Sequence, residues 1–145
     1  MGDFNGKVVV VTGATSGIGA ATAKKFAKLG ANVALIGRNQ QRGVQLENEL
    51  KQQGVNASFI ACDVSDHKQV ETMAAQVGKS FGRVDVLFNN AGVMLPSMEI
   101  ERMPVETWQE TFNININGIF YVTRSIKPYL IESHGTIINN ASIAG

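Results

Sequence analysis

Short apolar runs alternate along the chain with longer stretches whose apolar residues recur at helical spacing. The first run, Val8–Val11, precedes a glycine-rich turn and an alanine-rich amphipathic pattern. Continuous apolar runs of this kind are typical of strands that are covered on both faces. The pattern predicts strands over Lys7–Thr12, Asn32–Ile36, Asn56–Cys62, Val84–Asn89 and Thr136–Asn140. It predicts helices over Gly17–Leu29, Gln40–Gln53, Lys68–Phe81 and Val105–Ile131.

Glycines mark the ends of the predicted helices. Gly30, Gly54 and Gly82 each stand between a helix and the next strand, where a left-handed cap is needed. Alternating strands and helices imply right-handed crossovers. We therefore expect an α/β, Rossmann-like fold: a doubly wound parallel sheet in three α/β/α layers that stops after its fifth strand. Ligands of such sheets bind at the carboxyl ends of the strands, near the point where the strand order reverses.

The composition narrows the class of protein. The chain has 145 residues, which suits one domain, and its 44% hydrophobic and 17% charged fractions are ordinary for a soluble globular protein. A formal net charge of +1 gives no electrostatic reason to expect a nucleic acid or a membrane surface as partner. The single cysteine, Cys62, excludes an internal disulfide and is expected to be buried. We recognise no metal site, membrane span or signal-peptide pattern and expect a cytoplasmic location.

A glycine-rich turn follows the first predicted strand and begins the first predicted helix. Glycines let a phosphate approach the backbone closely, and the free N–H groups of the helix start point at it. The spacing is not the strict G-x-G-x-x-G, so a plain tight turn is the alternative; a P-loop is excluded because no Lys-Ser or Lys-Thr follows the glycines. The predicted dinucleotide contacts of this turn are Gly13, Thr15, Ser16, Gly17, Ile18 and Gly19.

The end of the second predicted strand bears on the choice of cofactor. In such folds an acid about 20 residues past the glycines binds the ribose 2′-hydroxyl of NAD. Here the strand is followed by Gly37-Arg38-Asn39, and the first acid beyond it is Glu47. A guanidinium binds a 2′-phosphate or stacks on adenine, whereas a carboxylate would repel the phosphate. Arg38 therefore favours NADP(H) over NAD, and a solvated surface charge is the alternative interpretation.

Polar residues also follow the third and fourth predicted strands. Asp63-Val64 is expected to contact adenine, although an aspartate in this place commonly caps a turn. Asn89-Asn90 brings two amides to the end of a buried strand, where each needs a hydrogen-bond partner. One amide is expected to tie neighbouring strands together, and an Asx turn is the alternative. The predicted cofactor contacts of these two segments are Asp63, Val64, Asn90, Ala91 and Gly92.

Two of these motifs in this order carry a resemblance. The glycine turn, Thr12-Gly13-x-x-x-Gly17-Ile18-Gly19, and the segment Asn89-Asn90-Ala91-Gly92 resemble the classical short-chain dehydrogenase/reductase family. The resemblance extends from Lys7 to Gly145, since Gly135–Gly145 is similar to the fifth strand of the family. It implies an oxidoreductase with a nicotinamide cofactor and a small carbonyl or alcohol substrate.

The resemblance also implies two catalytic residues. Asn115 matches the family's catalytic asparagine, which holds a helix main chain open for a water in a proton relay. Ser142 matches the catalytic serine, whose hydroxyl would bond the substrate carbonyl oxygen. Asn113 and Asn117 are expected to be amides on the helix surface. Ala141 stands where the family more often has a second hydroxyl.

The family's general acid/base is a tyrosine followed four residues later by a lysine, and no Tyr-x-x-x-Lys occurs in this chain. We therefore expect an amino-terminal portion of a longer enzyme that is inactive by itself. Its fifth strand would be a bare sheet edge with poorly covered isoleucines. The apolar surface of Val105–Ile131 is expected to pack partly on the sheet and partly, as in the family, on a second subunit. The parent is expected to be a homodimer or homotetramer.

Two function classes stay open at this point. The first is an NADP(H)-dependent carbonyl reductase or alcohol dehydrogenase, with NAD as the less favoured cofactor. The second is a catalytically inactive nucleotide-binding or partner-subunit module. Met94–Met98 either lines the apolar mouth of the pocket or packs as an ordinary loop, and the substrate itself is not readable from these residues.

Overall fold

The computed structural model describes residues 3–142, and its five strands form one sheet in the order β3-β2-β1-β4-β5. Every neighbouring pair of strands is parallel, and Val10 of β1 lies between Ala34 of β2 and Leu87 of β4. The order reverses between β1 and β4, which confirms the doubly wound sheet. The strands are β1 (Val8–Thr12), β2 (Asn32–Gly37), β3 (Ala57–Ala61), β4 (Val86–Asn89) and β5 (Thr136–Asn139).

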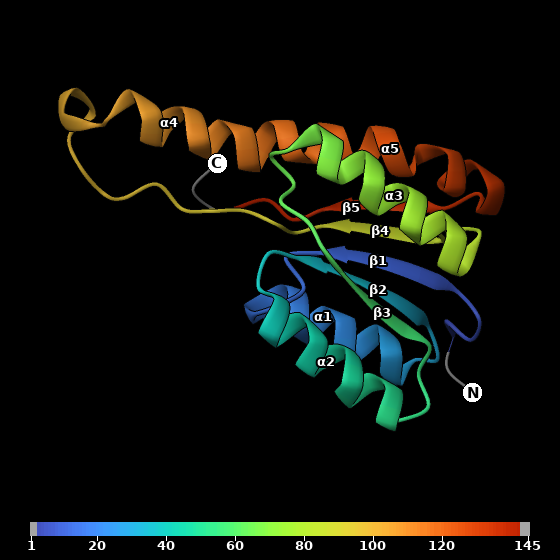
Figure 1. The fold of residues 1–145 in the computed structure, drawn as a ribbon. Coiled ribbons are helices and arrows are strands. Elements are labelled where there is room, and N and C mark those ends of the chain that lie inside the picture. Colours follow the sequence, from blue (N-terminus) through green and yellow to red (C-terminus); the bar gives the residue numbers. More distant parts are fainter. Residues whose placement is uncertain (1–2, 143–145) are drawn as a thin grey trace.

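Helices cover both faces of this sheet (Figure 1). Helices α1 (Gly17–Lys28) and α2 (Gln40–Gln52) lie on one face, and α3 (His67–Phe81) and α5 (Gly118–Ser133) lie on the other. Helix α4 (Val105–Phe112) stands out beyond the ends of the strands. Within the described residues, no helix is long and apolar enough to cross a membrane.

The continuous apolar run of β1 is buried on both sides. Val8 and Val10 belong to the apolar cluster shared with α3 and α5, while Val9 and Val11 belong to the cluster shared with α1 and α2. Successive side chains of a strand point to opposite faces, so a strand between two helical layers needs an apolar residue at every position. This arrangement confirms the two-sided burial that the sequence predicted.

The long helix predicted over Val105–Ile131 differs from the structure. It is divided into α4 and α5 by a π-helical turn, η2 (Asn113–Asn117), in which the N–H of Gly118 bonds the carbonyl of Asn113. A π turn holds one more residue than an α turn and widens the main chain locally. The spacing of apolar residues does not predict this turn, because the turn forms together with a side-chain contact to a loop that is distant in the sequence. A short 3-10 helix, η1 (Ile100–Arg102), was also not predicted.

The predicted ends of the other elements differ by one or two residues. Gly30, Gly54 and Gly82 have φ angles of 93°, 80° and 76°, which confirms their left-handed caps. His134, with φ 53°, takes the same conformation at the end of α5, where no glycine is available. Residues 143–145, which complete the predicted resemblance to the family's fifth strand, lie outside the described part.

Two apolar surfaces are uncovered in the described part of the chain. Both isoleucines of β5, Ile137 and Ile138, are 42% exposed, as expected for a bare sheet edge. Along α4, η2 and α5 one side of the helices is buried, with Val122 at 1% exposure. The other side is exposed, and its apolar residues include Trp108, Phe112, Ile116 and Phe120.

A carboxylate joins the amino ends of β1 and β4, at the opposite edge of the sheet from the carboxyl ends of the strands. Asp85 is 8% exposed and accepts hydrogen bonds from the N–H of Val8 at 2.9 Å and from Nη2 of Arg83 at 2.6 Å. Burial by itself would raise the pKa of Asp85, but the bonds from Val8, Arg83 and Lys7 outweigh it and lower this pKa. The ionised carboxylate therefore fastens the two strands together.

Candidate functional site

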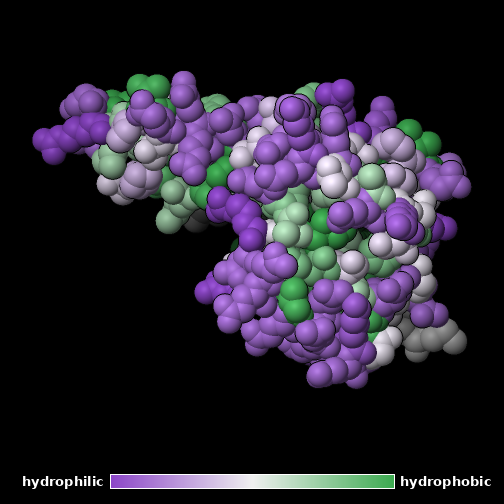
Figure 2. All heavy atoms as spheres, in the orientation of Figure 1, coloured by the Kyte–Doolittle hydropathy of each residue, from purple (hydrophilic) through white to green (hydrophobic). Residues whose placement is uncertain are grey.

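An open cavity of about 1120 Å³ lies at the carboxyl ends of the strands, where the strand order reverses. Figure 2 shows a recess on this side, beneath the arm that α4 forms with the segment before it. Every predicted site residue except Gly19 lines the cavity. The lining residues in the described part of the chain are Gly13, Thr15, Ser16, Gly17, Ile18, Gly37, Arg38, Asn39, Cys62, Asp63, Val64, Asn90, Ala91, Gly92, Val93, Met94, Leu95, Thr111, Ile114, Asn115, Asn140 and Ser142.

The glycine turn leaves the start of α1 open. Ser16 is the N-cap residue of α1, but its side chain makes no capping hydrogen bond. The first N–H groups of the helix lie at the wall of the cavity and have no side-chain cap. Free N–H groups of this kind are what an anion site requires. Gly13 and Gly17 have φ angles of 64° and 51°, which side chains other than glycine rarely adopt.

Gly19 lies behind the turn rather than on the cavity wall. A Cβ atom added to Gly19 would stand 2.1 Å from the carbonyl oxygen of Gly13 and 2.7 Å from Nδ2 of Asn90. Its role is to let α1 pack directly against the turn. A contact of Gly19 with the ligand stays a prediction, and what the structure adds is this packing role.

Thr12, at the end of β1, joins the glycine turn to the end of β4. Its side chain is 2% exposed, and its Oγ1 accepts hydrogen bonds from the N–H groups of Asn90 at 2.9 Å and Ala91 at 3.0 Å. These two bonds hold the segment after β4 against the turn. Thr12 was quoted in the motif but not predicted as a site residue, because a threonine at a strand end has no distinctive signal by itself.

Both amides at the end of β4, on its last residue Asn89 and on Asn90 directly after it, tie strands together, where only one was expected to do so. Asn89 Nδ2 donates to Oγ1 of Thr123 at 3.1 Å and to Oδ1 of Asn139 at 2.9 Å. Asn90 Nδ2 donates to the carbonyl oxygen of Thr12 at 3.1 Å. The two side chains therefore connect β4 to β5 and α5 on one side and to β1 on the other.

The two charged residues among the described lining residues, Arg38 and Asp63, follow β2 and β3. Arg38 is exposed and takes part in no ion pair within residues 3–142. Asp63 Oδ1 accepts hydrogen bonds from the N–H of Ser65 at 3.0 Å and from its Oγ at 2.7 Å. The turn-capping alternative for Asp63 is thus present, and an adenine contact by this side chain stays a prediction.

Cys62 is buried, as predicted, although its residue lines the cavity. Burial raises the pKa of its thiol to about 12, and the neighbouring carboxylates of Asp63 and Asp66 act in the same direction. The thiol is therefore protonated at neutral pH and unsuited to act as a nucleophile or a metal ligand.

Asn115 holds the backbone of the segment after β4. Its Oδ1 accepts from the N–H of Val93 at 2.8 Å, and its Nδ2 donates to the carbonyl oxygen of Val93 at 2.8 Å. Asn115 lies in the widened turn η2, and such π turns are frequent at functional sites. Asn117 Nδ2 donates to Oδ1 of Asn113 at 2.8 Å at the surface, which confirms the prediction for these two amides.

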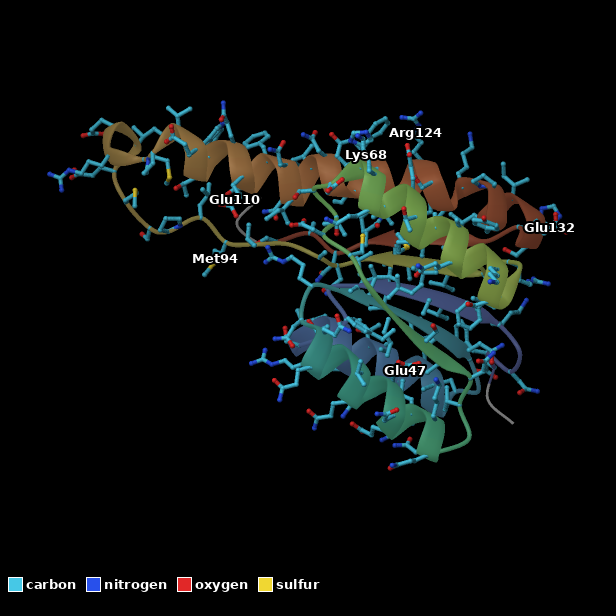
Figure 3. All side chains as sticks on the ribbon, in the orientation of Figure 1. Glu47, Lys68, Met94, Glu110, Arg124 and Glu132 are labelled. Atoms are coloured by element: carbon cyan, nitrogen blue, oxygen red, sulfur yellow. The ribbon has the colours of Figure 1, made fainter. Side chains whose placement is uncertain are left out.

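Ser142 stands on the cavity wall, and so does Asn140, two residues before it in the sequence. Asn140 Nδ2 donates to Oδ1 of Asn90 at 2.9 Å, so the end of β5 is joined to the segment after β4. From the loop after β4, Met94 and Leu95 line the cavity, whereas the rest of the predicted Met94–Met98 mouth does not. Figure 3 shows Met94 pointing away from α4, and it is 93% exposed.

Several lining residues were not predicted. Gly37 and Asn39 flank Arg38, and Asn140 stands two residues before Ser142. Like the predicted residues, these three lie at strand ends, and that position was the signal that could have found them. Thr111 and Ile114 were not recognisable, because they reach the cavity only through the packing of α4 and η2.

Comparison with known proteins agrees with this geometry. The family model described as short chain dehydrogenase matches residues 7–145. The chain belongs to this family. A 3beta-hydroxysteroid dehydrogenase of Mediterraneibacter gnavus is 37% identical to this chain over 145 residues, which are 100% of the chain and 52% of that relative. An L-fucose dehydrogenase of Oryctolagus cuniculus is 36% identical over 142 residues, 98% of the chain and 49% of that relative.

Solved structures of the family have the same fold. An NAD⁺-bound xylitol dehydrogenase superposes with a TM-score of 0.94 at 35% identity, covering 99% of this chain and 55% of that one. An L-sorbose reductase of Gluconobacter frateurii, in complex with NADPH and L-sorbose, superposes with a TM-score of 0.92 at 36% identity. The match covers 99% of this chain and 54% of that one. The chain spans about half the length of the curated relatives it matches. The family uses nicotinamide cofactors, and both NAD and NADP occur among these neighbours.

Proposed function

We propose that the chain forms the dinucleotide-binding half of an NADP(H)-dependent oxidoreductase that interconverts a carbonyl and an alcohol. The observation that carries the proposal is the cavity at the switch point of the sheet. Its wall carries the glycine turn and Arg38, which forms no ion pair within residues 3–142, and no acid stands at the end of β2. The nicotinamide, when bound, supplies the hydride chemistry. The activity belongs to a longer protein that carries this chain.

The residues present fit such a dinucleotide. The uncapped start of α1 offers N–H groups to its phosphates, and the absence of a side chain at Gly19 keeps the turn tight enough to do so. Arg38 lines the cavity, and in this proposal its guanidinium binds a 2′-phosphate with two parallel hydrogen bonds. In this proposal Asp63-Val64 lies against adenine, and Ala91-Gly92 lies against the nicotinamide riboside.

Two residues of the chain act on the substrate side. The Ser142 hydroxyl, on the cavity wall, donates a hydrogen bond to the substrate oxygen, where negative charge develops during reduction. Asn115 keeps the loop at Val93 in place and stabilises the widened turn η2, whose main chain takes part in the proton relay. The proton that the oxygen receives comes from a general acid that is not among these 145 residues.

Titration of the purified chain with NADPH and NADH tests the cofactor preference, with emission of the single tryptophan, Trp108, as the signal. We expect saturable NADPH binding and weaker NADH binding. Because charge-assisted hydrogen bonds contribute about 1.5–3 kcal/mol, Arg38→Ala should weaken NADPH binding roughly 10- to 100-fold and leave NADH binding nearly unchanged. Arg124→Ala is the control, since it also removes one cation but lies on α5 away from the cavity (Figure 3).

Equal affinities for NADPH and NADH in the unchanged chain would contradict the NADP assignment. Reduction of ketones by the 145-residue chain alone would contradict the proposal that catalysis needs a longer protein. Cofactor binding without turnover in the longer protein as well would favour the alternative, an inactive nucleotide-binding or partner-subunit module.

The longer protein is proposed to be a cytoplasmic homodimer or homotetramer. The exposed apolar side of α4, η2 and α5, with Phe112 and Phe120 at 44% and 58% exposure, supports a subunit interface there. Sedimentation velocity of the longer protein with and without Phe120→Glu checks this, because a buried carboxylate at an interface should dissociate the subunits.

A further inference from the structure

Asn140 occupies a position that links the two halves of the cavity. It follows the last residue of β5 and stands two residues before Ser142, and it lines the cavity. Its backbone N–H donates to the carbonyl oxygen of Asn89 at 2.9 Å, so it continues the pairing of β5 with β4. Its side chain donates from Nδ2 to Oδ1 of Asn90 at 2.9 Å.

The backbone of the glycine turn fixes the direction of both amides. Asn90 Nδ2 faces the carbonyl oxygens of Thr12 at 3.1 Å and Gly13 at 3.5 Å, and carbonyl oxygens only accept hydrogen bonds. Asn90 must therefore present its amino group to the turn and its Oδ1 to Asn140. It follows that Asn140 must donate through its Nδ2, and its own Oδ1 accepts no hydrogen bond from residues 3–142.

We propose that Asn140 is a positioning residue for the nicotinamide half of the dinucleotide, acting through Asn90 on the end of the glycine turn. The pair of amides couples the segment after β5, which contains Ser142, to the turn that holds the phosphates, so that the serine and the cofactor keep one relative position. The Oδ1 of Asn140 accepts a hydrogen bond from the nicotinamide riboside. This inference rests on the proposed function.

The neighbouring asparagine provides a matched control. Asn139 is the same residue type and directly precedes Asn140 as the last residue of β5, and its Oδ1 accepts from Asn89 Nδ2 at 2.9 Å. That contact lies beside Thr123 of α5, and Asn139 does not line the cavity. Replacing either asparagine removes one cross-strand amide bond, but only Asn140 stands where a ligand binds.

The test compares two ligands by calorimetric titration of the 145-residue chain. NADP⁺ contains the nicotinamide half, whereas 2′,5′-ADP contains only the adenosine half with its 2′-phosphate. We expect Asn140→Leu to weaken NADP⁺ binding about fivefold, which corresponds to ~1 kcal/mol, and to leave 2′,5′-ADP binding unchanged. Asn139→Leu should change the ratio of the two affinities less than twofold, whatever it does to thermal stability.

A second variant keeps the test decisive if Asn140→Leu does not fold. Asn140→Asp preserves the size of the side chain but replaces the donor that faces Asn90, so it should also weaken NADP⁺ more than 2′,5′-ADP. Equal weakening of both ligands would show a purely structural tie and overturn the inference, as would unchanged NADP⁺ binding in a folded variant. Failure of the unchanged chain to bind either ligand would instead refute the proposed function, and the inference with it.

Discussion

Replacement of Asn115 by leucine should loosen the loop after β4 and lower the stability of the whole chain. The Asn115 side chain is bonded to both the N–H and the carbonyl oxygen of Val93, each at 2.8 Å. Residues 90–99 form no helix or strand, so no ladder of backbone hydrogen bonds can replace these two contacts. Leucine is similar in size to asparagine but offers neither a donor nor an acceptor.

The expected loss follows from the two bonds and from the burial of their partner. A neutral hydrogen bond contributes about 1 kcal/mol net, and an unpaired buried group costs about 1–3 kcal/mol. Since Val93 is only half-buried, water partly compensates its backbone groups, and we expect a total loss of about 2–3 kcal/mol. At roughly 2–4 °C per kcal/mol for a domain near this size, the Tm should fall by roughly 5–10 °C.

Thermal unfolding followed by circular dichroism measures the loss, and amide hydrogen exchange locates it. Exchange of the Val93 N–H should accelerate in Asn115→Leu far more than exchange within β1. Asn117→Leu is the matched control from the same π turn, because its bond to Asn113 is exposed; its free energy of unfolding should change by less than about 0.5 kcal/mol. Unchanged exchange at Val93 together with an unchanged Tm would refute the reasoning.

Three further outcomes are expected. Gly19→Ala should lower the free energy of unfolding in urea by about 3 kcal/mol or more and abolish NADPH binding. The reason is that the added Cβ would stand 2.1 Å from the backbone oxygen of Gly13. Normal stability of this variant would show that the turn tolerates a side chain. The folded-state pKa of Asp85 is lowered, so its stabilisation is complete above the unfolded value near 3.9 and is lost as the pH falls through the folded value. Urea unfolding of Asp85→Asn should therefore show a deficit of about 1–3 kcal/mol at pH 7 that shrinks near pH 2, and a deficit independent of pH would contradict this. Cys62, with a thiol pKa of about 12, should resist iodoacetamide at neutral pH until the chain unfolds, and rapid labelling of the folded chain would disprove its burial.

Short-range patterns were sufficient for most of the architecture. The uninterrupted valines of β1 specified a strand buried on both faces, because a pleated strand alternates its side chains between two helical layers. Gly82 specified the end of α3, because only glycine takes a left-handed cap without strain. Arg38 was identifiable as a candidate because strand ends in a parallel sheet meet at one edge, whereas Ser142 was identified from the resemblance to the family.

The sequence by itself determined the alternation of strands and helices, the parallel sheet and the edge where a ligand would bind, since each depends on residues close together in the chain. Only the tertiary structure decided three features. These are the division of the long helix by η2, the position of Gly19 behind the turn and the hydrogen bond between Asn140 and Asn90. The Asn115–Val93 and Asn140–Asn90 contacts join residues 22 and 50 positions apart. Periodicity within a segment carries no information about such contacts, because they form only when separate elements pack against one another.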